Sequence, residues 1–184
     1  FWVIEDAAQA FLSKYNGRCL GTLGDIGTLS FHETKNIISG EGGAILLNHD
    51  DFIERAEIIW EKGTNRQQFF KNEVDKYTWV DIGSSYMPSE MIGAFLYAQL
   101  EMAEKIIAHR RRVFHQYHTL LRPLAERGRI GLPRINDSDE GNGHIFYILT
   151  ASLEERRELI EYLNKHGLNA VLHFIPLHCS PSGR

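Results

Sequence analysis

The sequence predicts an α/β chain whose first half forms part of a layer of parallel strands and whose end forms a smaller α+β unit. Three observations predict it: short apolar runs punctuated by glycine in the first half, a strongly helical pattern from Pro88, and a strand–helix–strand pattern over residues 144–174. We expect a partial large domain over residues 1–88, connecting helices over 89–127 and a partial small domain over 128–184.

The first half contains three runs that are expected to form buried strands. They cover residues 1–4, 28–32 and 44–47, and each is short, mostly apolar and followed by polar or glycine residues. The chain begins inside the first of these runs, with no helix or turn before it. We therefore expect the chain to be an internal fragment of a longer protein.

The middle of the chain predicts helices separated by one long loop. Asp50 or Asp51 can cap a helix over residues 52–60, where apolar side chains recur at helical spacing. Residues 64–87 are polar and aromatic without a clear period, which predicts a loop. Helix is then expected over residues 88–126, in one or two pieces.

The last part of the sequence predicts a compact unit. We expect a strand over residues 144–150, a helix over 153–166 and a strand over 168–174. Ser152 and Glu155 have the spacing of a capping box, which marks the start of the helix.

Composition disfavours several classes of function. The formal net charge of -4 and the pI near 6.1 give no reason to expect nucleic acid or an anionic membrane as a partner, and the basic run 109–112 is interpreted as a solvated helix face. No apolar run approaches the roughly 18 residues of a membrane span. Cys19 and Cys179 form no disulfide framework, so a cytoplasmic location is expected. His173 and His178 lack the second ligand pair of a closed zinc site, so no metal is expected.

Two residues at strand ends are candidates for chemistry. Asp6 follows the first strand, and carboxylates at the carboxyl ends of strands in an open α/β sheet point into the ligand crevice, while Glu5 faces the other way. Lys35 follows the second strand and precedes the glycine-rich turn 40–43, where a backbone can approach a ligand closely. Taken alone, Asp6 is more often a capping residue and Lys35 a solvated cation.

Pyridoxal phosphate (PLP) chemistry needs residues of these types. A lysine must bind the cofactor covalently and later move a proton, a carboxylate must keep the pyridine nitrogen protonated, and hydroxyls must hold the phosphate. Lys35, Asp6 and Ser30 match these roles in that order.

Seven segments along the chain support the same interpretation. They are residues 5–10 (EDAAQA), 30–37 (SFHETKNI), 40–43 (GEGG), 62–66 (KGTNR), 74–79 (VDKYTW), 81–86 (DIGSSY) and 174–178 (FIPLH). Together they resemble the PLP-dependent nucleotide-sugar aminotransferases, which have the aspartate aminotransferase fold (fold type I). The resemblance implies a PLP-dependent transferase-like fold with a mixed or parallel large-domain sheet.

The resemblance also implies roles for individual residues. Lys35 would carry the cofactor, Asp6 would pair with its ring nitrogen, Gln9 would contact its ring hydroxyl and Ser30 would bind its phosphate. These enzymes are homodimers with a shared active site, and Ser85 would reach the partner's phosphate, although many relatives have asparagine there. Dehydratases of the family have histidine in place of the lysine, so Lys35 argues against that branch.

The implied reaction transfers an amino group, with L-glutamate as the expected donor, to the 4-keto carbon of a dTDP-4-keto-6-deoxyhexose used for surface polysaccharides. Family members also have an earlier phosphate-binding loop and an aromatic ring that stacks on the cofactor, and this chain begins after both. The alternative is therefore a catalytically silent fragment or a dimerisation module of such an enzyme.

Overall fold

The computed structural model describes residues 1–136 and 138–183, which form two compact units. The first unit comprises Phe1–Tyr117 and Arg134–Phe146, and the second comprises His118–Pro133 and the residues from Tyr147 onward. The division of the chain into three parts at residues 88 and 127 stays a prediction.

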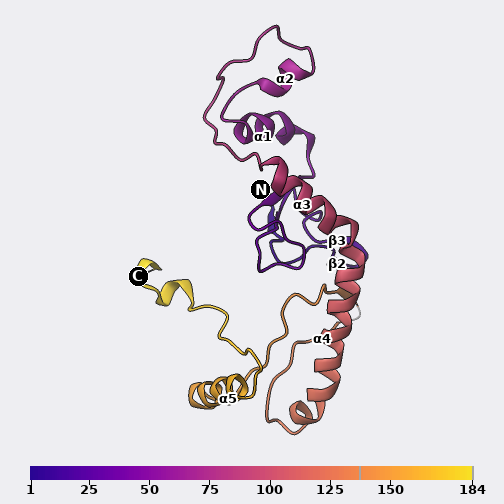
Figure 1. Cartoon of the computed structure of the whole chain (residues 1–184), viewed down its shortest axis with the longest axis vertical. Coiled ribbons are helices and arrows are strands. Elements are labelled where there is room, and N and C mark those ends of the chain that lie inside the picture. Colours follow the sequence, from indigo (N-terminus) through magenta and orange to yellow (C-terminus); the bar gives the residue numbers. More distant parts are fainter. Residues whose placement is uncertain (137, 184) are drawn as a thin grey trace. The chain divides into compact units, whose positions relative to one another are not determined.

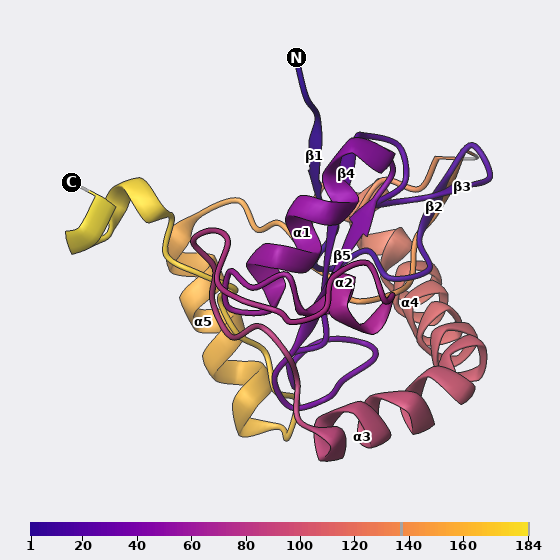
Figure 2. The same ribbon diagram turned by 90° about the horizontal axis from the view of Figure 1, so that it is seen from above.

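The first unit contains a three-stranded mixed sheet (Figure 2). Its order is β1 (Ile4–Asp6), β4 (Ile26–Ser30) and β5 (Gly43–Leu47). β1 and β4 are parallel, with Asp6 opposite Thr28, whereas β4 and β5 are antiparallel. The expectation of parallel strands is thus correct for one pair and wrong for the other, because the connection over residues 31–42 contains no crossover helix and returns the chain antiparallel beside β4.

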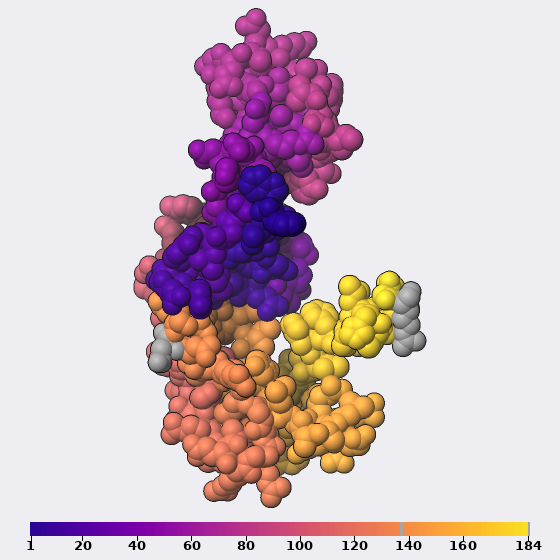
Figure 3. Space-filling view, turned by 180° about the vertical axis from the view of Figure 1, so that it is seen from behind, coloured from indigo at the N-terminus to yellow at the C-terminus, as the bar shows by residue number. Residues whose placement is uncertain are grey.

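The beginning of the chain differs from the prediction. The strand expected at residues 1–4 begins only at Ile4, and this segment is exposed instead of buried, with Trp2 at 61% and Ile4 at 66% of full accessibility. Figure 3 shows the first residues, in indigo, at the surface. The strand expected at residues 28–32 also lies two residues earlier, because the chain turns into the core directly after Ser30.

A second small sheet was not predicted. It consists of β2 (Lys14–Tyr15), β3 (Arg18–Cys19) and β6 (Asp139–Glu140), in the antiparallel order β3-β2-β6. Asn16 and Gly17, which join β2 to β3, have φ angles of 49° and 77°, as the tight turn of a hairpin requires. The sheet therefore joins residues that are more than a hundred positions apart in sequence to the same unit.

The helices that follow β5 agree with the prediction only in part. A 3-10 turn, η1 (Asp50–Phe52), leads directly into α1 (Ile53–Trp60), and α2 (Arg66–Phe70) lies within the segment expected to be a loop. The expected capping role of Asp50 or Asp51 is wrong, because both lie inside the 3-10 turn and no side chain caps it or α1.

The two following helices confirm the predicted helical stretch (Figure 1). α3 (Glu90–Glu101) begins after Ser89, whose hydroxyl accepts a hydrogen bond from the Ile92 N–H at 3.3 Å. The chain breaks at Met102 and continues as α4 (Ala103–Glu126). Within the described residues, no helix is both long enough and apolar enough to span a bilayer.

The core of the first unit lies directly after β4. Phe31, Ile37 and Ala103 are buried, and the rings of Phe31 and Phe11 meet edge to face with 5.9 Å between centroids. Partly buried apolar side chains surround them: Phe11, Leu12, Leu29, Ala44, Leu96 and Ile106. Because Phe31 and Ile37 flank residues 32–36, this core anchors the turn that contains the predicted cofactor lysine.

The second unit contains the predicted last helix. α5 (Leu153–Lys165) begins at a capping box, in which the Ser152 hydroxyl accepts from the Glu155 N–H at 3.1 Å and the Glu155 carboxylate accepts from the Ala151 N–H at 2.8 Å. Two short 3-10 turns follow, η2 (Leu177–Cys179) and η3 (Pro181–Gly183).

The strands predicted on either side of α5 are wrong. Residues 144–150 contribute only an isolated bridge from Leu149 to Gly131, and residues 168–174 form no strand, with Val171 and Phe174 more than two-thirds exposed. An apolar segment becomes a strand only when another strand pairs with it, and the described residues supply none here.

Candidate functional site

Three side chains lie on one face of the first sheet, which we call the site face: Asp6, Thr28 and Ser30. Asp6 is opposite Thr28 in the parallel pair, and Ser30 follows Thr28 by two positions, so the alternation along a strand gives all three the same side. The Asp6 carboxylate is exposed, and its Oδ1 accepts one hydrogen bond, from the Ala8 N–H at 3.2 Å. The site face therefore presents a carboxylate and two hydroxyls near the carboxyl ends of β1 and β4.

The preceding residue, Glu5, lies on the opposite face and is fully engaged there. Its carboxylate accepts backbone N–H groups of Gly21 (2.8 Å), Leu23 (2.5 Å) and Gly24 (2.6 Å). Burial raises the pKa of the Glu5 carboxyl, but the three N–H donors and the Arg18 guanidinium outweigh this effect, so the pKa lies below its ordinary value. Glu5 fastens β1 to the loop that precedes β4.

Lys35 lies in a closed turn after β4, residues 31–42, which we call the lysine turn. Main-chain bonds close it, from the Phe31 N–H to the Gly42 carbonyl at 2.8 Å and from the Glu33 N–H to the Gly40 carbonyl at 2.9 Å. The Lys35 N–H donates to the His32 carbonyl at 2.9 Å. Lys35 itself is half-buried and is followed by two buried residues, so its backbone is held while its side chain keeps access to solvent.

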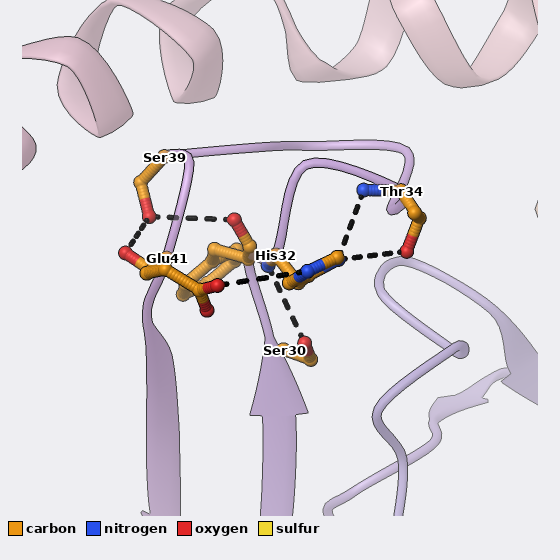
Figure 4. A network of polar contacts seen from close by, with 6 residues as sticks. Ser30, His32, Thr34, Ser39 and Glu41 are labelled. Atoms are coloured by element: carbon orange, nitrogen blue, oxygen red, sulfur yellow. Dashed lines mark hydrogen bonds and ion pairs between the residues drawn. The ribbon is translucent and has the colours of Figure 1, made fainter.

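A network of polar contacts supports the lysine turn (Figure 4). The His32 ring lies between Thr34, whose hydroxyl is 2.9 Å from Nδ1, and Glu41, whose carboxylate is 3.6 Å from Nε2. The Ser39 hydroxyl donates to the Glu41 carbonyl at 2.8 Å, and the Ser30 hydroxyl accepts a long bond of 3.4 Å from the His32 N–H. The weakness of this last contact leaves the Ser30 hydroxyl able to donate to a ligand.

The other two predicted site residues lie in different surroundings. Gln9 follows β1, and its side chain is exposed. Ser85 is exposed and forms an isolated bridge with Glu61, beyond α1. The roles proposed for both residues stay predictions.

Sequence reasoning missed two asparagines next to the predicted site. Asn36 directly follows Lys35, and the side chain of Asn142 donates to the Gln9 carbonyl. Both residues are almost completely buried, with only 6% of Asn36 and 5% of Asn142 exposed. Asn36 was visible as the neighbour of Lys35 in the sequence, but nothing in the sequence indicated that Asn142 reaches a segment about 130 residues away.

The chemistry of these residues fits PLP. An exposed carboxylate, a lysine on an anchored turn and an underused hydroxyl are the groups that a pyridine nitrogen, an aldehyde and a phosphate require. Gly42 has a φ of 151°, and a Cβ there would lie 2.7 Å from the Ser39 hydroxyl, so glycine is needed at the end of the turn. Among the described residues, no three His, Cys, Asp or Glu side chains are grouped so that they could hold a metal ion.

Comparisons with known proteins give the same picture. The model of the DegT/DnrJ/EryC1/StrS aminotransferase family matches residues 1–183. GDP-perosamine synthase of Escherichia coli O157:H7 is 32% identical over 98% of this chain and 46% of its own length. The dTDP-4-dehydro-2,3,6-trideoxy-D-glucose 4-aminotransferase of Saccharopolyspora spinosa is 27% identical over 97% of this chain and 47% of its own length.

A solved structure supports the fold. The chain is similar to DesV of S. venezuelae with a TM-score of 0.82 and 27% identity, covering 100% of this chain and 46% of DesV. The predicted PLP-dependent transferase-like fold is confirmed, and so is PLP as the cofactor of the family. The chain spans somewhat less than half the length of these relatives. With its family model matched over residues 1–183, the chain belongs to the DegT/DnrJ/EryC1/StrS aminotransferase family.

Proposed function

We propose that this chain is the catalytic-lysine portion of a PLP-dependent nucleotide-sugar aminotransferase. The observation that carries the proposal is the arrangement around β4: Asp6 and Ser30 share one sheet face, and Lys35 follows on a closed turn anchored by the core. The family membership of the chain supports the same reaction type.

Each of these residues has a chemical role in the proposal. When bound, PLP supplies an electron sink for the reacting carbon. The Asp6 carboxylate holds the proton on the ring nitrogen, and the Ser30 hydroxyl donates to the phosphate. The Lys35 amine would hold the cofactor, and as a free amine it would take the proton from the substrate carbon that bears the amino group. Gln9 contacts the ring hydroxyl.

The finer assignment concerns substrates and assembly. We propose L-glutamate as the amino donor and the 4-keto carbon of a dTDP-4-keto-6-deoxyhexose as the acceptor. This is the reaction of dTDP-4-amino-4,6-dideoxygalactose transaminase, which the later segments resemble most: residues 62–66, 74–79, 81–86 and 174–178. The product would serve surface-polysaccharide synthesis, such as lipopolysaccharide or enterobacterial common antigen, in the cytoplasm. One of these relatives is named for a GDP-linked sugar and another for a dTDP-linked sugar, so the identity of the nucleotide must also be tested.

The assembly that we propose is a homodimer with a shared active site. Ser85 lies beyond α1 on the exposed surface, where it can serve a neighbouring subunit. Crosslinking of the protein with and without PLP, with Ser85→Ala as the variant, tests this assignment: a dimer that binds PLP equally well without the hydroxyl argues against it.

Covalent trapping tests the central role of Lys35. The chain is incubated with PLP, reduced with borohydride and digested, and the labelled lysines are identified by mass spectrometry. We expect labelling concentrated on Lys35 in the unchanged chain and its loss in Lys35→Ala. In a longer protein that contains this chain, Lys35→Ala should abolish transamination, and retained turnover would refute the role. A panel of GDP-, dTDP- and UDP-linked keto-sugars, with product masses recorded, then identifies the acceptor.

A second candidate function is a catalytically silent module that serves dimerisation. The observation in its favour is that the chain spans less than half the length of its relatives. Measuring PLP trapping and transamination side by side in the chain and in the longer protein separates the two. Trapping by the longer protein alone supports the silent module for the isolated chain.

A further inference from the structure

Asn142 uses every polar atom of its side chain to join separate parts of the first unit. Its Nδ2 donates to the carbonyls of Gln9 at 2.9 Å and Phe11 at 3.0 Å, and its Oδ1 accepts from the His144 N–H at 3.0 Å. The residue is 5% exposed, so these bonds replace water almost entirely. Asn142 thus fixes the main chain that follows Asp6.

Asn36 makes the corresponding link from the lysine turn. Its Nδ2 donates to the Asn142 carbonyl at 3.0 Å, and its Oδ1 lies 3.0 Å from Nδ1 of His144. Since the amide nitrogen of Asn36 is used as a donor, its oxygen accepts, and Nδ1 of His144 carries the proton. Asn36 is 6% exposed and is the residue next to Lys35.

The segment that contains Asn142 is itself held in place. Arg111, on α4, donates to the carbonyls of Gly141 at 2.7 Å, Glu140 at 3.3 Å and Leu12 at 3.4 Å. The segment 140–144 is therefore fixed to a long helix. The hydrogen bonds of both asparagines involve residues of this fixed segment.

We propose that Asn36 and Asn142 are positioning residues, which hold the Gln9 loop and the lysine turn in one fixed relation through the segment 140–144. The inference rests on the proposed function, because it concerns the loops that would carry the cofactor. Neither asparagine touches the cofactor in this proposal. Each acts through its neighbour, Asn36 on the backbone of Lys35 and Asn142 on that of Gln9.

The arrangement favours positioning over general stabilisation. The links join two loops that follow different strands, β1 and β4, at the ends where the site face carries its polar groups. By contrast, Asn48 donates to two main-chain carbonyls, those of Gly21 at 3.0 Å and Gly24 at 2.9 Å, at the opposite end of β4. Asn48 is exposed, but it makes the same kind of bonds away from the predicted cofactor residues, so it serves as the control for bond type.

Hydrogen exchange of the cofactor-free chain tests the physical part of the proposal. Asn142→Ala should raise exchange roughly tenfold in residues 9–12, whose carbonyls lose their hydrogen bonds to the side chain. It should also raise exchange in 33–37, because the Asn142 carbonyl that Asn36 bonds then belongs to a loosened segment. Asn36→Ala should raise it in 33–37. Asn48→Ala should raise exchange only around residues 21–24. Equal exchange in the lysine turn for Asn142→Ala and the unchanged chain would overturn the coupling.

PLP trapping tests the consequence for the site. Either asparagine variant should slow borohydride-fixed labelling of Lys35 roughly tenfold or more, since small misplacements of a reacting group are costly, while labelling of the other lysines is unchanged. The Asn48→Ala variant should label Lys35 normally. Because one broken link already separates the two loops, the double variant should be no slower than the slower single variant. Additive slowing would show two independent local effects and would overturn the proposal that the two asparagines act together.

A folding control keeps the outcomes distinct. Far-ultraviolet circular dichroism identifies variants that do not fold, and for these Asn142→Ser, which keeps a small polar group, takes the place of the alanine variant. If the unchanged chain fails to label at Lys35 under any condition, the proposed function of the isolated chain fails, while the exchange data still decide whether the loops are coupled. Normal labelling of Lys35 in folded asparagine variants would overturn the positioning role.

Discussion

The two faces of the first sheet treat adjacent carboxylates in opposite ways. On one face, Glu5 accepts three backbone N–H groups, and Gly27 lies so close to the main chain of Gly21 that a Cβ there would be 2.1 Å from its carbonyl oxygen. On the site face, Asp6 accepts one hydrogen bond and remains exposed. The Glu5 carboxylate is therefore fully hydrogen-bonded within the fold, whereas the neighbouring Asp6 carboxylate is available to a ligand.

The largest effect on stability is expected at Gly27, on the face of the sheet that carries Glu5. Gly27→Ala would drive a Cβ into the backbone of Gly21, so we expect a loss of about 3 kcal/mol or more in the free energy of unfolding. Urea denaturation followed by circular dichroism measures this loss. Gly93→Ala in α3 is the control, because outside the local helix backbone no atom lies within 4 Å of the added Cβ; it should stabilise the chain by about 0.5–1 kcal/mol. Equal stability of the two variants would contradict the close packing described for this face.

Removing the charge of Glu5 should have the next largest effect. In Glu5→Gln, one acceptor oxygen becomes an NH2 group that faces a backbone donor, and we expect a loss of about 2 kcal/mol in the free energy of unfolding. The same urea titration measures it, with hydrogen exchange of residues 21–24 as the local readout. Unchanged exchange in that loop would show that the carboxylate does not hold it.

Stability should depend on pH through the same residue. Because the pKa of Glu5 is lowered in the folded chain, its contribution is fully present above the ordinary value of 4.5 and is lost as the pH falls through the lowered folded value. The urea concentration at the midpoint of unfolding, recorded from neutral to acid pH, should decrease as the pH passes through this range. The decline should be shallower in Glu5→Gln, and parallel curves for the two proteins would remove Glu5 as the cause.

The smallest effect on stability is expected on the site face. Asp6→Asn keeps an oxygen for the Ala8 N–H, so the free energy of unfolding should change by less than about 0.5 kcal/mol. The variant should nevertheless bind PLP more weakly, because a neutral amide cannot hold a proton on the ring nitrogen. Titration of PLP absorbance against protein measures the affinity. Unchanged affinity would remove the reason for assigning Asp6 to the ring.

Local signals predicted much of the fold. Strand alternation correctly separated Glu5 from Asp6, and the capping box at Ser152 marked the start of α5. The helical period identified the region of α3 and α4. These features depend on residues a few positions apart, which is why they can be found in one sequence.

The predictions failed where structure depends on distant partners. The apolar segment 168–174 has strand-like composition but no strand to pair with, and the two-residue strands of the second sheet form because Lys14 meets Glu140. The candidate site divides in the same way. Lys35 and Asp6 were predicted from motif and strand position, and their roles stay predictions, whereas the link through Asn142 required the folded chain.

The dipeptide Asn142–Gly143 carries a chemical liability that substitution of its glycine cannot remove. Gly143 has a φ of 65°, and a Cβ there would lie 2.7 Å from the backbone of Arg110, so glycine is needed beside the asparagine. Asparagine followed by glycine is prone to deamidation, in which the glycine nitrogen attacks the side-chain carbonyl and ammonia leaves. The same hydrogen bonds that immobilise the Asn142 amide protect it from this attack, so chemical ageing at this position should proceed mainly through molecules that have transiently unfolded.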